Sequence, residues 1–103
     1  MAANVIVLYN HPTDPAAFDA YYLSTHAPIA KKMPGLRKYM VSREAVSTPQ
    51  GDKPYHLIAT LEFDSLAAAG AAFGSPEGAA ALADIPNFAS GGLTVLMYEM
   101  QEV

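Results

Sequence analysis

Two stretches near the ends of the chain are apolar at every position, and they constrain the fold more than any other feature. Residues 5–8 read Val-Ile-Val-Leu and residues 95–98 read Val-Leu-Met-Tyr, which is typical of β-strands. Successive strand residues point to opposite faces of a sheet, so both faces of these strands are apolar. An antiparallel sheet covered by helices on one face normally alternates apolar and polar residues, because its other face meets water. These strands therefore need a second cover.

The composition agrees with a second cover supplied by another copy of the chain. Of the 103 residues, 51% are hydrophobic and 16% are charged, whereas charged residues make up about a quarter of an average globular domain. A chain this small has a large surface for its volume, so its surplus of apolar residues is most simply buried at a subunit interface. We expect one domain, residues 1–103, that forms a homodimer through its sheets.

The segment after the first strand, residues 4–9, predicts a helix that begins near Pro15. Asp14 can accept backbone hydrogen bonds as the N-cap, and proline suits the first helical position. Helical spacing places four side chains on one stripe, with His26 at its edge: Phe18, Tyr22, Thr25 and Ile29. Pro28 lacks an N–H group and disfavours helical geometry at Ala27. We therefore expect the helix to kink or end around residues 26–28.

The rest of the chain completes an α+β pattern. The Pro34-Gly35 turn precedes a strand over residues 36–46, and a polar loop over 47–54 leads to a strand over 55–63. Residues 65–73, capped by Asp64 or Ser65, and residues 76–83 predict two short helices, and residues 93–102 a last strand. The order β-α-β-β-α-β is ferredoxin-like, with a four-stranded antiparallel sheet and helices on one face.

Several classes of function are disfavoured by what the sequence contains. The net charge of −4, with six basic residues, argues against binding nucleic acid. No apolar run approaches the roughly 20 residues that span a bilayer, and the N-terminus does not read as a secretory signal, so we expect a cytoplasmic protein without membrane contact. There is no cysteine, the three histidines are not at metal-ligand spacing, and no nucleotide-binding motif occurs. We expect neither a metal nor a cofactor.

A set of residues from the first helix to the last strand forms a recognisable pattern. They are Tyr22, His26 and Pro28, then Pro34-Gly35, Arg37 and Tyr39, and finally Pro86-Asn87-Phe88 before the last strand. This pattern resembles the EthD-like family of dimeric α+β barrels, over nearly the whole chain. The resemblance implies a dimer built through the sheets and a small-molecule pocket between sheet and helices. Relatives include isomerases of the muconolactone type, cofactor-independent monooxygenases and enzymes of polyketide-derived aromatics, so it does not imply one reaction.

His26 is the candidate catalytic residue. The C-terminal end of a helix favours its charged form and burial favours its neutral form, so a histidine balanced between them serves as a general acid or base near neutral pH. The alternative is a packed histidine that bonds a backbone carbonyl freed by Pro28. Both interpretations remain open from the sequence.

Five further residues are candidates for binding a substrate: Tyr22, Tyr9, Tyr39, His11 and Phe88. Tyr22 lies one helical turn before His26, and Tyr9 and His11 lie at the end of the first strand, where a pocket mouth lies in this topology. Tyr39 shares a sheet face with Arg37, and Phe88 lies in a loop that can close over a pocket. Each also has a purely structural interpretation, as a core aromatic, a surface turn or a loop anchor.

Three classes of function remain compatible with the sequence. The first is a cofactor-free enzyme, of oxidoreductase, isomerase or lyase type, in which His26 transfers protons with an apolar or aromatic substrate. The second is a non-catalytic protein that binds a small molecule or assists an enzyme. The third is a haem-handling protein, since other branches of the superfamily use this fold to bind haem through a histidine.

Overall fold

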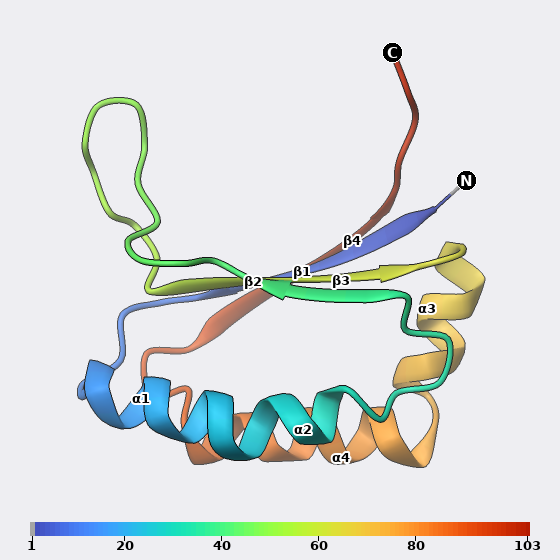
Figure 1. Ribbon diagram of the computed structural model, residues 1–103, viewed down its shortest axis with the longest axis horizontal. Helices are drawn as coiled ribbons and strands as arrows, with labels where there is room; N and C mark the ends of the chain where they lie inside the picture. Colours follow the sequence, from blue (N-terminus) through green and yellow to red (C-terminus); the bar gives the residue numbers. More distant parts are fainter. Residues whose placement is uncertain (1) are drawn as a thin grey trace.

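The computed structural model describes residues 2–103 as a four-stranded antiparallel sheet with helices on one face (Figure 1). Its strands are β1 (Ala3–Tyr9), β2 (Lys38–Val41), β3 (Leu57–Phe63) and β4 (Leu93–Glu99), in the spatial order β2-β3-β1-β4. Its helices are α1 (Pro15–Tyr21), the π-helical turn η1 (Tyr22–His26), α2 (Ala27–Ala30), α3 (Leu66–Phe73), α4 (Pro76–Asp84) and the 3-10 turn η2 (Ile85–Asn87). The predicted β-α-β-β-α-β order and ferredoxin-like fold are confirmed.

The helices form one layer under the sheet. In Figure 1, α1, α2 and α4 run side by side beneath the strands, and α3 closes one end. The loop between β2 and β3 and the segment after β4 both project from the opposite, helix-free side. No helix among the described residues combines the length and the apolar character needed to cross a membrane.

The core lies between the sheet and the helices. Alternate residues of β1 and β3 point into it, so that Val5 and Phe63 are fully buried and Tyr9 nearly so. Phe18 and Tyr22 of the first helix pack edge-on against the Tyr9 ring, with ring centroids 5.4 and 5.6 Å away. This aromatic cluster fixes the first helix on the sheet.

The other face of the sheet is apolar and has no cover within residues 2–103. Ile6 and Leu8 of β1 are half-buried there, while Met40, Leu96 and Tyr98 are 57%, 49% and 40% exposed. The strand register places Ile6 opposite Leu96. The sequence predicted that the first and last strands are apolar on both faces, and the structure agrees. One face of these strands packs on the helices, and the other is exposed. We call the second one the open face.

The first helix departs from the expected periodicity at its middle. Asp14 is the N-cap, accepting the Ala17 N–H at 3.1 Å, as expected. At Tyr22 the helix switches to a π-helical turn, in which the Ala27 N–H donates to the Tyr22 carbonyl five residues back. The wider turn shifts the buried face by one residue, so His26 is buried and Thr25 is exposed. The expectation that Thr25 belongs to the stripe was wrong.

Pro28 does not end the helix. His26 and Ala27 keep helical backbone angles, and the chain continues as α2 to Ala30. The helix is irregular near Pro28, as expected, but the irregularity is the π-helical turn η1 immediately before the proline.

Three predicted strands are shorter than expected, and one of them, β3, begins at Leu57 rather than at residue 55. β2 covers only Lys38–Val41, and beyond Ser42 a single bridge pairs Val46 with Tyr55. Glu44 adopts a left-handed backbone with φ 61°, which takes the chain out of the sheet. Residues 42–56 therefore form an arm that projects beyond the sheet, and β4 ends at Glu99. The N-cap of α3 is Ser65 rather than Asp64.

Candidate functional site

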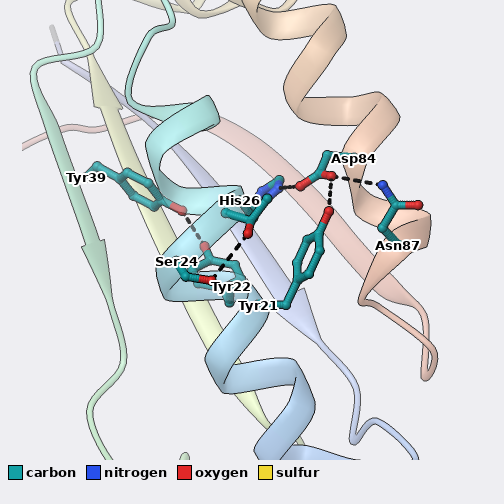
Figure 2. A network of polar contacts seen from close by, with 8 residues as sticks. Tyr21, Tyr22, Ser24, His26, Tyr39, Asp84 and Asn87 are labelled. Carbon is teal, nitrogen blue, oxygen red and sulfur yellow. Dashed lines mark hydrogen bonds and ion pairs between the residues drawn. The ribbon is translucent and has the colours of Figure 1, made fainter.

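His26 and Asp84 form a buried pair between two helices (Figure 2). His26 is the last residue of η1, which continues into α2, and Asp84 is the last residue of α4; their side chains point toward one another. Nδ1 of His26 lies 3.0 Å from Oδ2 of Asp84, and the two residues are only 4% and 8% exposed. A polar pair this deeply buried persists only when its hydrogen bonds are made.

Asp84 is held as a carboxylate by several donors. The Tyr21 hydroxyl donates to Oδ1 at 2.6 Å, and the Asn87 amide donates to the same oxygen at 3.0 Å. Burial raises the pKa of Asp84, but the hydrogen bonds from Tyr21, Asn87 and His26 outweigh it, so the pKa lies below its ordinary value. Asp84 is therefore ionised at neutral pH.

The ionised partner fixes the protonation of the His26 ring. A carboxylate only accepts hydrogen bonds, so Nδ1 must carry the proton that it shares with Asp84. Burial lowers the pKa of His26, and this effect exceeds the opposing hydrogen bond and charge of Asp84. The sequence suggested two opposing effects on the pKa of His26, burial and the end of a helix. Burial is the larger of the two. At neutral pH the ring is neutral, with the Nε2 lone pair available as a base.

Tyr22 and Tyr39 lie beside the histidine. Their hydroxyl groups share a hydrogen bond that joins the first helix to β2. Burial raises the pKa values of Tyr22, Tyr39 and Tyr9, so all three phenols stay protonated and able to donate. The Tyr22 ring centroid is 5.2 Å from that of His26. The site thus combines one base with several hydroxyl donors.

A small cavity of about 30 Å³ lies between these groups. His26, Tyr9, Tyr22 and Tyr39 contribute to a lining that is otherwise apolar. Such a volume holds about one water molecule. At its outer side lie Leu82 of α4 and Val95 of β4, which are 44% and 43% exposed. A haem does not fit in a cavity of this size.

Phe88 supports the histidine ring. It follows η2, is buried, and its ring centroid lies 4.6 Å from that of His26 and 5.6 Å from that of Tyr9. The same loop contributes Asn87, which bonds Asp84. The loop before the last strand therefore holds both members of the pair in place.

The candidate His11 lies elsewhere. Its Nε2 donates to the Lys53 carbonyl at 2.6 Å, in the arm of residues 42–56. The other histidine outside the pair, His56, bonds Asp19 at 2.7 Å, and its ring centroid is 6.2 Å from that of His11. Arg37, considered as a possible carboxylate ligand, instead forms an exposed ion pair with Asp64 at 3.2 Å. Within residues 2–103 no three acidic or histidine side chains converge as metal ligands do.

Sequence reasoning missed Asp84 and Tyr21. Asp84 lies far from His26 along the chain, so no local spacing joins them. One signal was present, because Asp84 is the single charged residue between Glu77 and Glu99. A charge in the last turn of an alanine-rich helix needs partners if that turn is buried, and Asn87 one turn later supplies the first.

The fold is shared with distant solved structures. SnoaB from Streptomyces nogalater, a cofactor-independent oxygenase solved as a mutant, superposes with a TM-score of 0.63 at 16% identity, over 99% of this chain and 94% of that chain. A dimeric ferredoxin-like protein from Thermobifida fusca gives 0.71 at 17% identity, over 97% and 92%. At such identities the likeness shows the fold alone.

Closer relatives share the sequence as well. An uncharacterized 11.0 kDa protein in the thcB-thcC intergenic region of Rhodococcus erythropolis is 43% identical, over 96% of this chain and 95% of its own. The crystal structure of an ethyl tert-butyl ether D (EthD) family protein from Bacillus halodurans is 35% identical with a TM-score of 0.89, over 98% of this chain and 100% of that one. The model of the EthD domain matches residues 10–92. The chain therefore belongs to the EthD family.

Proposed function

We propose that this protein is a cofactor-free enzyme in which His26 transfers a proton to or from a small apolar or aromatic substrate. The observation that carries the proposal is the buried Asp84 carboxylate, which fixes His26 as the Nδ1–H tautomer and leaves Nε2 as a base. Two further donors keep that carboxylate in its charged form and so keep the tautomer fixed.

The proton transfer can be followed atom by atom. Nε2 takes a proton from a substrate O–H group, or from a C–H group next to a carbonyl, and the bonding electrons stay on the substrate. The imidazolium so formed lies 3.0 Å from the Asp84 carboxylate, which stabilises it. The hydroxyls of Tyr22 or Tyr39 donate to the developing negative oxygen.

The fate of the substrate anion sets the reaction class. Return of the proton from Nε2 to another carbon is an isomerisation, and loss of a leaving group is a lyase reaction. Reaction of the anion with dioxygen, with the substrate as the electron donor, is a cofactor-free oxidation. SnoaB has the same fold and is a cofactor-independent oxygenase. That likeness supports the class of chemistry and leaves the substrate open.

A substrate must enlarge the site to reach Nε2. The present cavity holds about one water molecule. The exposed Leu82 and Val95 at its outer side are the lining residues whose movement disturbs the core least. We propose that a ligand enters between α4 and β4 by displacing these two side chains.

The test is turnover without any added cofactor. The purified protein is incubated with phenols, dihydroxyaromatics and unsaturated lactones, while absorbance and dissolved oxygen are followed. We expect one class to be converted, and His26→Gln to lower its rate by about 100-fold or more. Thr25→Gln, an exposed substitution in the same turn, is the control and should keep the rate. The absence of conversion in every class, or an unchanged rate in His26→Gln, contradicts the proposal.

A second candidate is a non-catalytic protein that binds a small ligand or assists another enzyme. The tight packing around His26 favours it, because the pair also ties the first helix to α4. In that case His26→Gln lowers the melting temperature and leaves ligand binding unchanged. The melting temperature and the ligand binding of His26→Gln, measured together, therefore distinguish the two candidates.

We also propose that the working form is a homodimer joined through the open faces of the sheets. The support is the apolar open face, where Met40, Leu96 and Tyr98 are exposed in one chain. Exposed apolar surface of this kind marks an interface. The protein from Thermobifida fusca with the same fold is dimeric.

A further inference from the structure

A second and much larger cavity lies beside the first helix, next to the arm of residues 42–56. Its volume is about 630 Å³, within the range of small-molecule sites. It is open to solvent and is bounded by the first helix, by the end of β2 and by the arm. Tyr22 is part of the walls of both cavities, but neither His26 nor Asp84 reaches this one.

One wall of this cavity is apolar. Leu23 of the first helix, Val41 of β2 and Leu57 of β3 contribute to it. Leu23 is 65% exposed. An apolar body in the cavity would cover this side chain.

Two unpaired basic side chains lie at the rim of the cavity, in a chain that is negative overall. Arg43 and Lys53, two of the six basic residues, line it, and within residues 2–103 neither is paired with an acidic side chain. Two carboxylates also belong to the lining: Asp19 accepts a hydrogen bond from His56 at 2.7 Å, and Glu44 is unpaired. Positive and negative groups are therefore equal in number, but both positive groups and only one negative group are without a partner.

The two histidines of the cavity are fixed in place. Nε2 of His11 must donate to the Lys53 carbonyl, and Nε2 of His56 to the Asp19 carboxylate, because both oxygens only accept. The Phe18 ring packs edge-on against His56 with centroids 4.8 Å apart. Each ring keeps its Nδ1 for a further hydrogen bond. Preorganised polar groups beside an apolar wall are the usual make-up of a ligand site.

We infer that this cavity binds a small organic carboxylate, with its apolar body on Leu23, Val41 and Leu57 and its carboxylate between Arg43 and Lys53. The inference concerns a site separate from the His26 pair. It adds a ligand class to the protein whatever reaction His26 performs.

The test is a titration with 4-phenylbutanoate, its uncharged amide and acetate, followed through the backbone amide signals of the ¹⁵N-labelled protein. We expect the acid to shift signals of residues 41–45 and 53–57 and to bind about tenfold more tightly than the amide, the ratio for one charge-assisted hydrogen bond. Acetate, which lacks the apolar body, should bind far more weakly than the acid.

Two double variants separate the effect of the two basic residues at the rim from the effect of the protein's net charge. Arg43→Gln with Lys53→Gln should reduce the affinity for the acid to that for the amide, without changing the Lys53 carbonyl that holds His11. Arg37→Gln with Lys38→Gln removes the same charge from exposed positions outside the lining and should leave the affinity unchanged. The inference is overturned if the acid and the amide bind equally, or if the acid does not bind at millimolar concentration. It is also overturned if the two double variants lose the same affinity, or if the acid shifts amide signals elsewhere in the chain. The readout is binding at the arm, so it does not depend on proton transfer by His26.

Discussion

Nδ1 of His26 lies 3.0 Å from Oδ2 of Asp84, although the two residues are 58 positions apart in the chain. The pair joins the end of the π-helical turn to the end of α4, and the loop that follows supplies Asn87 and Phe88 to hold it. Two helices and a loop thus converge on one imidazole ring. This convergence is the structural basis of the proposed proton transfer.

Replacing the carboxylate should destabilise the fold. Asp84→Asn presents an amide to Tyr21, Asn87 and His26, which all donate to the carboxylate in the native protein. The amide can bond all three only if His26 changes tautomer, and the charge-assisted hydrogen bonds then become neutral ones, at a cost of about 1–3 kcal/mol in the free energy of unfolding. Urea denaturation at neutral pH measures it. Asp64→Asn, whose carboxylate is in an exposed ion pair, should change stability by less than about 1 kcal/mol. Equal effects would contradict a larger stabilising role for the buried Asp84 network than for the exposed ion pair.

Stability should fall between about pH 7.5 and pH 5, in part because of His26. Burial lowers its folded pKa below the ordinary value of 6.5, so in that window the unfolded chain binds more protons. The contribution is therefore fully present above pH 6.5 and is lost as the pH falls through the folded pKa. Urea denaturation at both pH values measures the difference.

The matched variants for this pH dependence are His26→Gln and Thr25→Gln. His26→Gln cannot titrate and should show a smaller loss of stability on acidification. Thr25→Gln keeps all three histidines and should lose as much as the native protein. A loss that is the same in both variants would mean that His26 is not the titrating group.

The local parts of the fold could be predicted from sequence, and the non-local parts of the site could not. Asp14 and Ser75 act as N-caps before proline because the signal lies within a few residues. Burial of His26 and exposure of Thr25 depend on the π-helical turn, which breaks the 3.6-residue period that the prediction assumed. Asp84 was missed because only the packing of α4 beside the first helix brings it to His26.

The assembly prediction now rests on the open face. From the sequence alone, Val5 and Val95 were equally good positions to disrupt a dimer, but the register places both on the helix side of the sheet. Leu96 is the better choice, because it lies on the open face opposite Ile6 and is 49% exposed. Val5→Asp should instead unfold the chain, since it puts a charge at a fully buried position.

Sedimentation at micromolar concentration tests the dimer. The native protein should have about twice the monomer mass, and Leu96→Asp should be folded but monomeric. Leu66→Asp, at a 38% exposed leucine of α3 that is not on the open face, is the control and should stay dimeric. A native protein that sediments as a monomer would refute the proposed assembly.

The protonation of the His26 ring is the most direct test of the account. Its ¹⁵N chemical shifts, read from long-range couplings to the ring protons at pH 7, distinguish the two neutral tautomers and the imidazolium. The account predicts a protonated Nδ1, bonded to Asp84, and an unprotonated Nε2. Asp84→Asn should remove the preference for this tautomer. A proton on Nε2 at pH 7, alone or together with Nδ1, would leave no base at the cavity and contradict the proposed role of His26.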